Sequence, residues 1–422
     1  MTNPPDDSTE AATAEPAAFG DVPILLFVRG LALVSILVGL IVGFHVYLGL
    51  RLIRDAQVPA PMSGVLWAAL WVAFGSIFGG FIGGRVLRKR IAHVLQWVGF
   101  GWMGAFGLLL VGTAASDLVL WAFSKGGDPL WQAWRAAAVV GITGPALAYG
   151  FWVGRRPEVK RITVDIPGLG AGLDGTRIVQ ISDVHIGETL GKDFAQLVAD
   201  TVNSLTPDLV AVTGDMIDGS VARLRDQVKP LGTMRAKHGV FFVTGNHEYY
   251  SGGAAWEAEA RALNMTVLHN EHRVIEQNGA QLIIGGVTDL EGARFSPSHA
   301  PRADLAFAGA PAGAPRVLLA HQPRFAEVAA AEKVSLMLSG HTHGGQIFPF
   351  MFLVKLQQPV IGGFATIAGV PTYTSNGTGY WGPPFRVGPR GEITEITLRS
   401  VPAIRTARRA LNADGREYSM CR

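Results

Sequence analysis

Two histidines separated by one residue stand in a glycine-rich turn, GHTHGG, from Gly340 to Gly345. The turn directly follows the apolar run VSLML, Val334 to Leu338, which is typical of a buried strand. Because glycine permits a positive φ and adds no side-chain bulk, the backbone can bend tightly and present His341 and His343 at one point. Two imidazoles that converge at a strand end are a common way to hold a transition metal. A polar turn with incidental histidines is the alternative.

Four other apolar runs end in polar residues of the same kind. The motifs are Asp183-Val184-His185, Gly214-Asp215-Met216-Ile217-Asp218, Gly245-Asn246-His247-Glu248 and His321. Each follows a predicted strand, so each is a loop residue positioned by a rigid element. Since α/β folds place ligand sites at the carboxyl ends of their strands, the five strand ends predict one common site.

The donor set of this predicted site contains imidazoles, carboxylates and one amide oxygen. It offers no thiolate, because the single cysteine of the chain is Cys421 near its end, which also excludes an intramolecular disulfide. Nitrogen and oxygen donors suit Mn, Fe, Zn, Co or Ni. Seven candidate ligands suit two ions that share a carboxylate. Such a pair, about 3.5–4 Å apart, can clamp both oxygens of an in-line displacement, which favours hydrolysis of a phosphate ester or anhydride.

The elements that must position these residues alternate between strands and helices after about Pro157. Strands are predicted for RIVQIS, DLVAVTG, GVFFVTG, QLIIGGV and RVLLAHQ. Apolar residues recur at helical spacing from Lys192 to Leu205, from Val221 to Met234 and from Ala254 to Leu263. Residues 360–398 are rich in Gly and Thr and predict β-hairpins. The alternation implies mixed sheets flanked by helices.

The first 155 residues are a different kind of sequence and explain why the chain is 49% hydrophobic and only 16% charged. Long apolar runs occur at about 23–50, 62–84, 94–123 and 131–153. Each exceeds the roughly 20 residues that a helix needs to cross a bilayer. Small residues such as Gly75 and Gly79 recur within the runs, and Trp97 and Trp131 lie near run ends, as in membrane helices. We therefore predict four membrane spans.

Loop charge predicts the orientation of these spans, because cytoplasmic loops carry an excess of Lys and Arg. On one side lie Arg85, Arg88, Lys89 and Arg90, together with Arg155, Arg156, Lys160 and Arg161. The other side holds only Arg51, Arg54 and Lys125. We therefore expect a multi-pass protein of the inner or cell membrane, with its N-terminus and everything after Val153 in the cytoplasm.

The motifs D-x-H, G-D-x-x-D, G-N-H-[DE], H and G-H-x-H, in this order, resemble those of the calcineurin-like metallophosphoesterases. The longer stretches GHTHGGQIF and GNHEYY look more like the bacterial membrane-associated branch, which includes enzymes acting on UDP-2,3-diacylglucosamine. The resemblance covers about residues 160–400. It implies two stacked mixed β-sheets flanked by helices, so the expected fold is a helical membrane domain of four spans plus an α/β metallophosphoesterase domain.

The resemblance also implies roles for individual residues. One ion would be held by Asp183, His185, Asp215 and His343, and the other by Asp215, Asn246, His321 and His341. Asp215 would bridge the two ions, and His247 would stabilise phosphoryl oxygens or protonate the leaving group. Asp218 either orients a ligand or caps the following helix. Glu248 stands where this branch often has Asp, and it should matter little unless its carboxylate fixes His247.

Four segments follow from these patterns. They are a disordered tail over 1–20, a four-helix transmembrane domain over 21–155, a metallophosphoesterase catalytic domain over 156–400 and a basic C-terminal tail over 401–422. The net charge of only +3 gives no case for a nucleic-acid partner. The sequence leaves the oligomeric state open.

The leading hypothesis is a membrane-anchored, metal-dependent phosphoric ester or anhydride hydrolase with two divalent ions, Mn, Fe, Zn or Co. Its substrate is either a lipid-linked phosphoester or pyrophosphate, such as a UDP-diacylglucosamine, or a soluble phosphodiester. A membrane sensor or transporter with an accessory phosphoesterase domain is an alternative, although the spans lack a dense polar lining. The complete ligand set argues against an inactive binding module.

An apolar segment directly after the glycine turn bears on the substrate. It is IFPFMFLVKL, Ile347 to Leu356, and it lies within a few residues of His341 and His343. Pro349 disfavours a regular central strand there. The segment either contacts lipid beside the site or fills the core beneath the closing hairpins.

Overall fold

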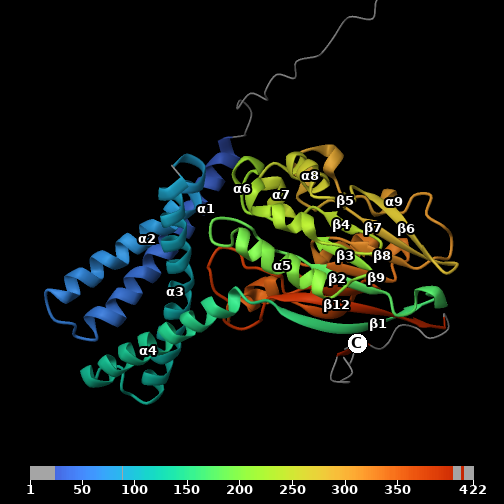
Figure 1. Ribbon diagram of the computed structural model, residues 1–422. Coiled ribbons are helices and arrows are strands. Elements are labelled where there is room, and N and C mark those ends of the chain that lie inside the picture. Colours follow the sequence, from blue (N-terminus) through green and yellow to red (C-terminus); the bar gives the residue numbers. More distant parts are fainter. Residues whose placement is uncertain (1–23, 88, 403–409, 413–422) are drawn as a thin grey trace, which may run out of the picture.

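The computed structural model describes residues 24–87, 89–402 and 410–412 (Figure 1). The expected tail over 1–20 and most of the expected tail over 401–422 lie outside these residues. Four long helices come first: α1 (Ile24–Gly49), α2 (Met62–Val86), α3 (Lys89–Ala122) and α4 (Pro129–Gly154). A π-helical turn, Leu50–Arg54, continues α1. The described residues after α4 belong to an α/β part that stands beside the helices in Figure 1.

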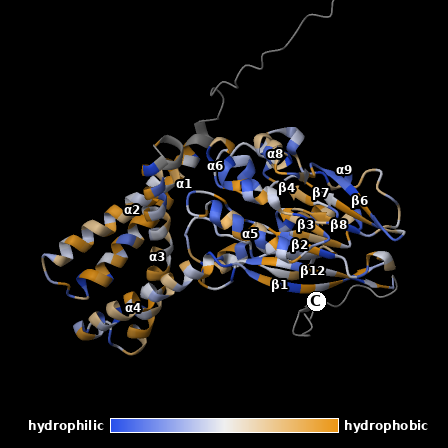
Figure 2. Ribbon diagram, in the orientation of Figure 1, coloured by the Kyte–Doolittle hydropathy of each residue, from blue (hydrophilic) through white to orange (hydrophobic). Residues whose placement is uncertain are grey.

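Among the described residues, four helices are long and apolar enough to cross a membrane. The candidate spans are Val28–Arg54, Met62–Ile82, Arg90–Ala122 and Pro129–Gly154. Large apolar side chains such as Leu33, Val72 and Ile142 are exposed on them, and Figure 2 shows apolar residues along the helices. Such surfaces are stable only in contact with lipid or another apolar partner. The four expected apolar helices are therefore confirmed.

The α/β part contains two mixed sheets. The first has the strand order β13-β1-β12-β2-β3-β4-β5. Its strands are β1 (Glu158–Pro167), β2 (Arg177–Ile181), β3 (Leu209–Thr213), β4 (Val240–Val243), β5 (Met265–Val267), β12 (Glu392–Val401) and β13 (Ala410–Asn412). The second has the order β10-β11-β9-β8-β7-β6. Its strands are β6 (Glu271–Gln277), β7 (Ala280–Gly286), β8 (Arg316–Leu319), β9 (Leu336–Ser339), β10 (Gly363–Ile367) and β11 (Val370–Thr374).

The sheets pack face to face, as the resemblance implied. Ile178 and Phe241 of the first sheet share one apolar core with Ile284, Val317 and Leu338 of the second. Because side chains alternate along a strand, the next residues face outward and meet helices. The helices α5 (Lys192–Ser204), α6 (Val221–Val228) and α8 (Gly253–Ala262) cover the first sheet, and α9 (Ala303–Ala306) and α10 (Ala326–Ala329) cover the second.

Two predicted elements differ from the observed ones. The helix expected from Val221 to Met234 ends at Val228, and a 3-10 turn, Lys229–Thr233, follows. Pro230 explains the change, because proline has no backbone N–H to donate to an α-helix. The expected closing hairpins are present only in part. β10 and β11 pair as a hairpin, whereas β12 crosses to the first sheet and pairs with β1 and β2.

The α/β part packs against the helices at glycine positions. A Cβ atom on Gly104 of α3 would lie 2.7 Å from the ring of Phe385, and one on Gly107 would lie 2.8 Å from the ring of Phe350. On α4, the carbonyl of Gly150 accepts a hydrogen bond of 3.0 Å from the backbone N–H of Arg386. The missing side chains let the loops after β9 and β11 approach the helix backbones, so these loops connect the two parts of the molecule.

Candidate metal centre

The predicted ligand loops meet at the carboxyl ends of the strands. β2, β3 and β4 are parallel neighbours in the first sheet, and β8 and β9 are parallel neighbours in the second. Because neighbouring parallel strands end at the same edge, the loops after these five strands lie together. The isolated bridge between Ile186 and Ile217 and the hydrogen bond from Asp183 N to Gly214 O hold the first two loops side by side.

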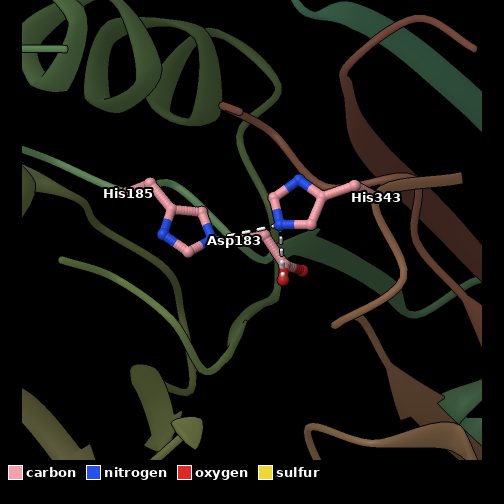
Figure 3. A group of neighbouring side chains, drawn as sticks. All are labelled: Asp183, His185 and His343. Atoms are coloured by element: carbon pink, nitrogen blue, oxygen red, sulfur yellow. Dashed lines mark hydrogen bonds and ion pairs between the residues drawn. The ribbon is translucent and has the colours of Figure 1, made fainter. Parts of the chain in front are cut away.

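Asp183, His185 and His343 form the first cluster of donor atoms, and their side chains point toward one another in Figure 3. The Nε2 atoms of His185 and His343 are 3.1 Å apart. His343 Nε2 lies 3.4 Å from Asp183 Oδ1. All three residues are buried. Their spacing resembles that of ligand atoms around one small cation.

Asn246, His321 and His341 form the second cluster. The Oδ1 atom of Asn246 lies 3.0 Å from His341 Nδ1 and 3.2 Å from His321 Nε2. Asp215 stands between the clusters, because its Oδ2 atom is 3.1 Å from His321 Nε2 and 3.8 Å from His185 Nε2. Every one of the seven expected ligands therefore lies in one of the two clusters or between them.

Hydrogen bonds to other groups orient two of the imidazoles. His321 Nδ1 is 2.8 Å from the carbonyl oxygen of Thr213, which can only accept, so Nδ1 carries the proton. His185 Nδ1 lies 2.9 Å from Asp218 Oδ1 in the same manner. In each ring Nε2 therefore faces the cluster and is the nitrogen that a metal would bind in place of a proton. This donor set, neutral imidazole with carboxylate and amide oxygen, fits a divalent transition metal.

The backbone at the ligands is strained. Asp183, His185, Asp215, His341 and His343 all have a positive φ, between 50° and 72°. For residues with a Cβ atom this region costs roughly 1–3 kcal/mol each and persists where the surroundings impose it. The expected glycine turn is present, since Gly344 and Gly345 have φ values of 62° and 81°. A Cβ atom on Gly340 would lie 2.2 Å from Asp183 Oδ2, so that position also excludes a side chain.

Asp218 contacts two histidines. Its Oδ1 atom is 2.6 Å from His247 Nδ1, in addition to its contact with His185. It does not cap the following helix α6, whose N-cap residue is Ser220. Burial lowers the pKa of His247, but the carboxylates of Asp215 and Asp218 outweigh it and raise this pKa to about 9. The two histidines in turn overcome the effect of burial and hold the pKa of Asp218 well below its usual value.

Glu248 has a different role from the one considered. It is fully buried, and its carboxylate accepts hydrogen bonds from the backbone N–H groups of Gly245 (2.7 Å), Asp215 (3.0 Å) and Met216 (2.8 Å). Burial and the charge of Asp215 raise the pKa of Glu248 to about 7. The residue therefore ties the loop after β3 to the loop after β4 instead of fixing the His247 side chain.

Arg386 is a site residue that sequence reasoning missed. Its guanidinium group is buried and donates to the carbonyl oxygens of His343 (3.0 Å), Asn376 (2.7 Å) and Gly379 (2.6 Å). These bonds hold the GHTHGG turn against the loop after β11. The surrounding sequence, PPFRVGPRG, contains no spacing or periodicity that could have identified it.

A cavity of about 750 Å³ opens beside the clusters. Asp215, His247 and His341 line one end. The remainder of the lining is mainly apolar and comes from three helices and the residue before the last of them. These residues are Ile41 and Phe44 of α1, Met103, Phe106 and Leu110 of α3, Phe350, and Val354 of α11 (Met351–Val354). Trp381 packs edge-on against His247 with 5.6 Å between ring centroids, so it forms part of the same wall. The donor atoms therefore face a space that is closed on one side by the candidate spans.

Comparisons with known proteins agree with this geometry. Residues 176–345 match the family described as calcineurin-like phosphoesterase. The chain is 37% identical over 251 residues to a "Transmembrane protein with metallophosphoesterase domain" of Danio rerio, covering 58% of this chain and 57% of that protein. It is 36% identical over 252 residues to an "Uncharacterized metallophosphoesterase" of Helicobacter pylori, covering 59% and 66%.

A further relative is matched almost throughout. This "Uncharacterized metallophosphoesterase" of Aquifex aeolicus is 30% identical over 244 residues, which cover 57% of this chain and 92% of that protein. By contrast, the chain spans little more than half the length of the Danio rerio protein. None of these three names states a substrate. From the matched ligand motifs, the two stacked sheets and this relative, we conclude that the chain belongs to the calcineurin-like metallophosphoesterases.

Proposed function

We propose that the protein is a membrane-anchored hydrolase of phosphoesters or pyrophosphates that uses two divalent metal ions. Asp183, His185, Asp215 and His343 would hold one ion, and Asp215, Asn246, His321 and His341 the other. The position of Asp215 Oδ2, within 4 Å of a histidine of each cluster, supports a shared ligand most directly. Bound ions would supply Lewis-acid activation of the phosphoryl group and of water.

The protein's own groups add proton transfer and charge balance. Asp215 and Asp218 raise the pKa of His247, and Asp218 Oδ1 lies 2.6 Å from its Nδ1. Both effects favour the protonated ring, which would stabilise phosphoryl oxygens or donate a proton to the leaving group. Asn246 supplies a neutral oxygen, which limits the negative charge in a site that must accept a phosphate. Asp218 positions both His185 and His247 and thereby couples a metal ligand to the proposed acid.

The cavity favours a lipid-linked substrate, such as a UDP-diacylglucosamine, over a soluble diester. Its apolar wall comes from the central turns of α1 and α3 and from Phe350. Apart from the buried Ile347, the segment Ile347–Leu356 lies outside the core, because Phe348, Phe352 and Leu353 are 52–60% exposed. Contact with lipid or acyl chains would stabilise each such side chain by roughly 1.5–3 kcal/mol.

A second, more polar hollow also borders His247. It has a volume of about 550 Å³, and Glu188, Asp218 and Arg223 line it. His247, Tyr250 and Trp381 belong to both spaces. A substrate with an acyl tail and a polar head could therefore place its phosphate at the ligands, its tail along α1 and α3, and its head in the polar hollow.

We further propose that the catalytic domain is cytoplasmic, from the excess of Lys and Arg on its side of the spans. A C-terminal alkaline phosphatase fusion should be inactive, because that reporter matures only outside the cytoplasm, and a C-terminal fluorescent fusion should be bright. The opposite pair of results would reverse the orientation and place the substrate on the outer face.

Asp215→Ala should empty or scramble both metal positions, because the proposed bridge is lost. Phosphodiesterase activity should fall by several orders of magnitude, whereas His247→Ala should keep its ions and lose turnover. Metal content by plasma mass spectrometry, measured beside the rate with Mn²⁺, separates the two variants. Retention of two ions per chain by Asp215→Ala would rule out the bridging role.

Asp218→Asn should weaken metal binding by about 10–100-fold, the effect expected when a group that orients a ligand is changed. The cause would be the weaker hydrogen bond to His185 Nδ1. Competition titration against a chelating dye measures it. The matched control is Asp226→Asn, since Asp226 is exposed and forms an ion pair with Lys229 far from the site. Equal affinities for the two variants would show that Asp218 does not position His185.

Phe350→Ser combined with Val354→Ser should reduce activity on a diacylated phosphodiester in vesicles more than about tenfold relative to a small soluble diester. The ratio follows from the loss of two apolar contacts, those of Phe350 and Val354 with the acyl chains of the substrate. Leu356→Ser is the control, because Leu356 is 82% exposed and does not line the cavity. An equal loss on both substrates, with a lower melting temperature, would assign these side chains to stability instead of substrate binding.

A further inference from the structure

A third cluster of potential metal ligands lies outside the centre described above. It contains Glu257 of α8, His269 in the turn between β5 and β6, and His299 of a 3-10 turn, Pro297–His299. We propose that these residues bind an additional divalent ion of the Zn²⁺ class, through two imidazole nitrogens and one carboxylate oxygen. Ion binding at this site does not require the two-metal hydrolysis proposed above.

The donor atoms have the spacing of a metal site. Glu257 Oε1 lies 2.8 Å from His269 Nδ1 and 3.6 Å from His299 Nδ1. The ring centroids of His269 and His299 are 4.6 Å apart, and the ring planes cross at 72°. Both rings can therefore direct a nitrogen to one point. Tetrahedral zinc with bonds near 2.0–2.1 Å places its ligand atoms about 3.3 Å apart. The first cluster of the main centre shows similar contacts, of 3.1 and 3.4 Å.

Hydrogen bonds to neighbouring groups orient the His269 ring. Its Nε2–H donates to the carbonyl oxygen of Ser298 at 3.0 Å, and its Nδ1 donates to Glu257 at 2.8 Å, so a bound ion would take the place of the Nδ1 proton. An imidazole that binds a metal usually donates its other N–H in this way. The Tyr249 hydroxyl lies 3.0 Å from His299 Nδ1 but also 3.1 Å from Thr244 Oγ1. It can therefore turn to Thr244 and leave His299 Nδ1 to the ion.

The surroundings suit a small cation that enters from solvent. The Glu257 side chain is only 7% exposed, whereas His269 and His299 are 25% and 16% exposed. A buried carboxylate is costly without a charged partner, and Glu257 is paired with His269 at 2.8 Å and with Arg261 at 3.5 Å. A divalent ion would replace the proton between Glu257 and His269 and keep the carboxylate paired. Two partly exposed histidines leave a path to the carboxylate, and a fourth position remains for water.

The position of the cluster gives the ion a structural role next to the main centre. It joins α8 to the turn before β6 and to the segment around residues 296–300. The Tyr249 ring packs edge-on against His299, with 5.4 Å between ring centroids, so the cluster also reaches α7 (Asn246–Tyr250), the helix that carries Asn246 and His247. An ion at Glu257 would therefore brace the helix that supplies one ligand and the proposed acid of the main centre.

The test counts ions in the full-length protein in detergent after equilibration with Zn²⁺ and removal of free metal. Glu257→Gln and His269→Ala should each lose one equivalent of zinc relative to the wild type. His272→Ala is the matched control and should lose none, because His272 lies nearby in β6 and contacts the carbonyl of Ala306 instead. Glu257→Gln keeps the side-chain shape, so it remains informative if His269→Ala fails to fold.

Cobalt gives a second readout that does not depend on activity. Co²⁺ absorbs visible light more strongly in a four-coordinate site than in a six-coordinate one, so the third site should add a band that Glu257→Gln removes and Asp215→Ala retains. Loss of the band in Asp215→Ala alone would assign it to the main centre. Equal zinc content and equal spectra for wild type and Glu257→Gln would overturn the proposal and leave a hydrogen-bonded Glu–His cluster.

Discussion

The structure depends on the convergence of two sheet edges at the buried carboxylate of Asp215. His185, from the first sheet, approaches it from one side, and His321, from the second, from the other. That approach requires the sheets to stack and the strands to end together. Five of the candidate ligands adopt left-handed backbone conformations in this arrangement. Two side chains stabilise this strained arrangement. Glu248 accepts hydrogen bonds from three backbone N–H groups, and Arg386 donates to the carbonyl oxygen of His343.

The same loops that hold the ligands also contact the candidate membrane helices. The GHTHGG turn leads into Phe350, which packs against Gly107 of α3, and Arg386 is bonded through its backbone to Gly150 of α4. A displacement of α4 would therefore shift Arg386, which is hydrogen-bonded to the carbonyl oxygen of His343. A displacement of α3 would shift Phe350, which follows the GHTHGG turn. The helices do more than tether the domain in this arrangement, because α1 and α3 supply a wall of the cavity in front of the ligands.

Residue type and order predicted that the seven candidate ligands would converge, because each carries a donor atom and follows an apolar run that is typical of a strand. His341, His343 and the other five candidate ligands therefore stood out locally in the sequence. Roles that depend on distant partners did not, as Arg386 and the backbone bonds of Glu248 show. The same limit applies to the fold. Apolar periodicity predicted strands and helices, but not that β12 leaves the closing hairpin and pairs with β1. The stacking of the two sheets was expected only from the family resemblance. The packing of the loops against glycines of α3 and α4 is seen only in the structure.

The most direct test of this account is anomalous diffraction from crystals of the full-length protein grown with Mn²⁺. A bridging Asp215 predicts two peaks about 3.5–4 Å apart, one beside Asp183, His185 and His343 and the other beside Asn246, His321 and His341. Asp215 should lie within bonding distance of both. A single peak, or two peaks that share no contact with Asp215, would contradict the central claim that one buried carboxylate joins the two halves of the metal centre.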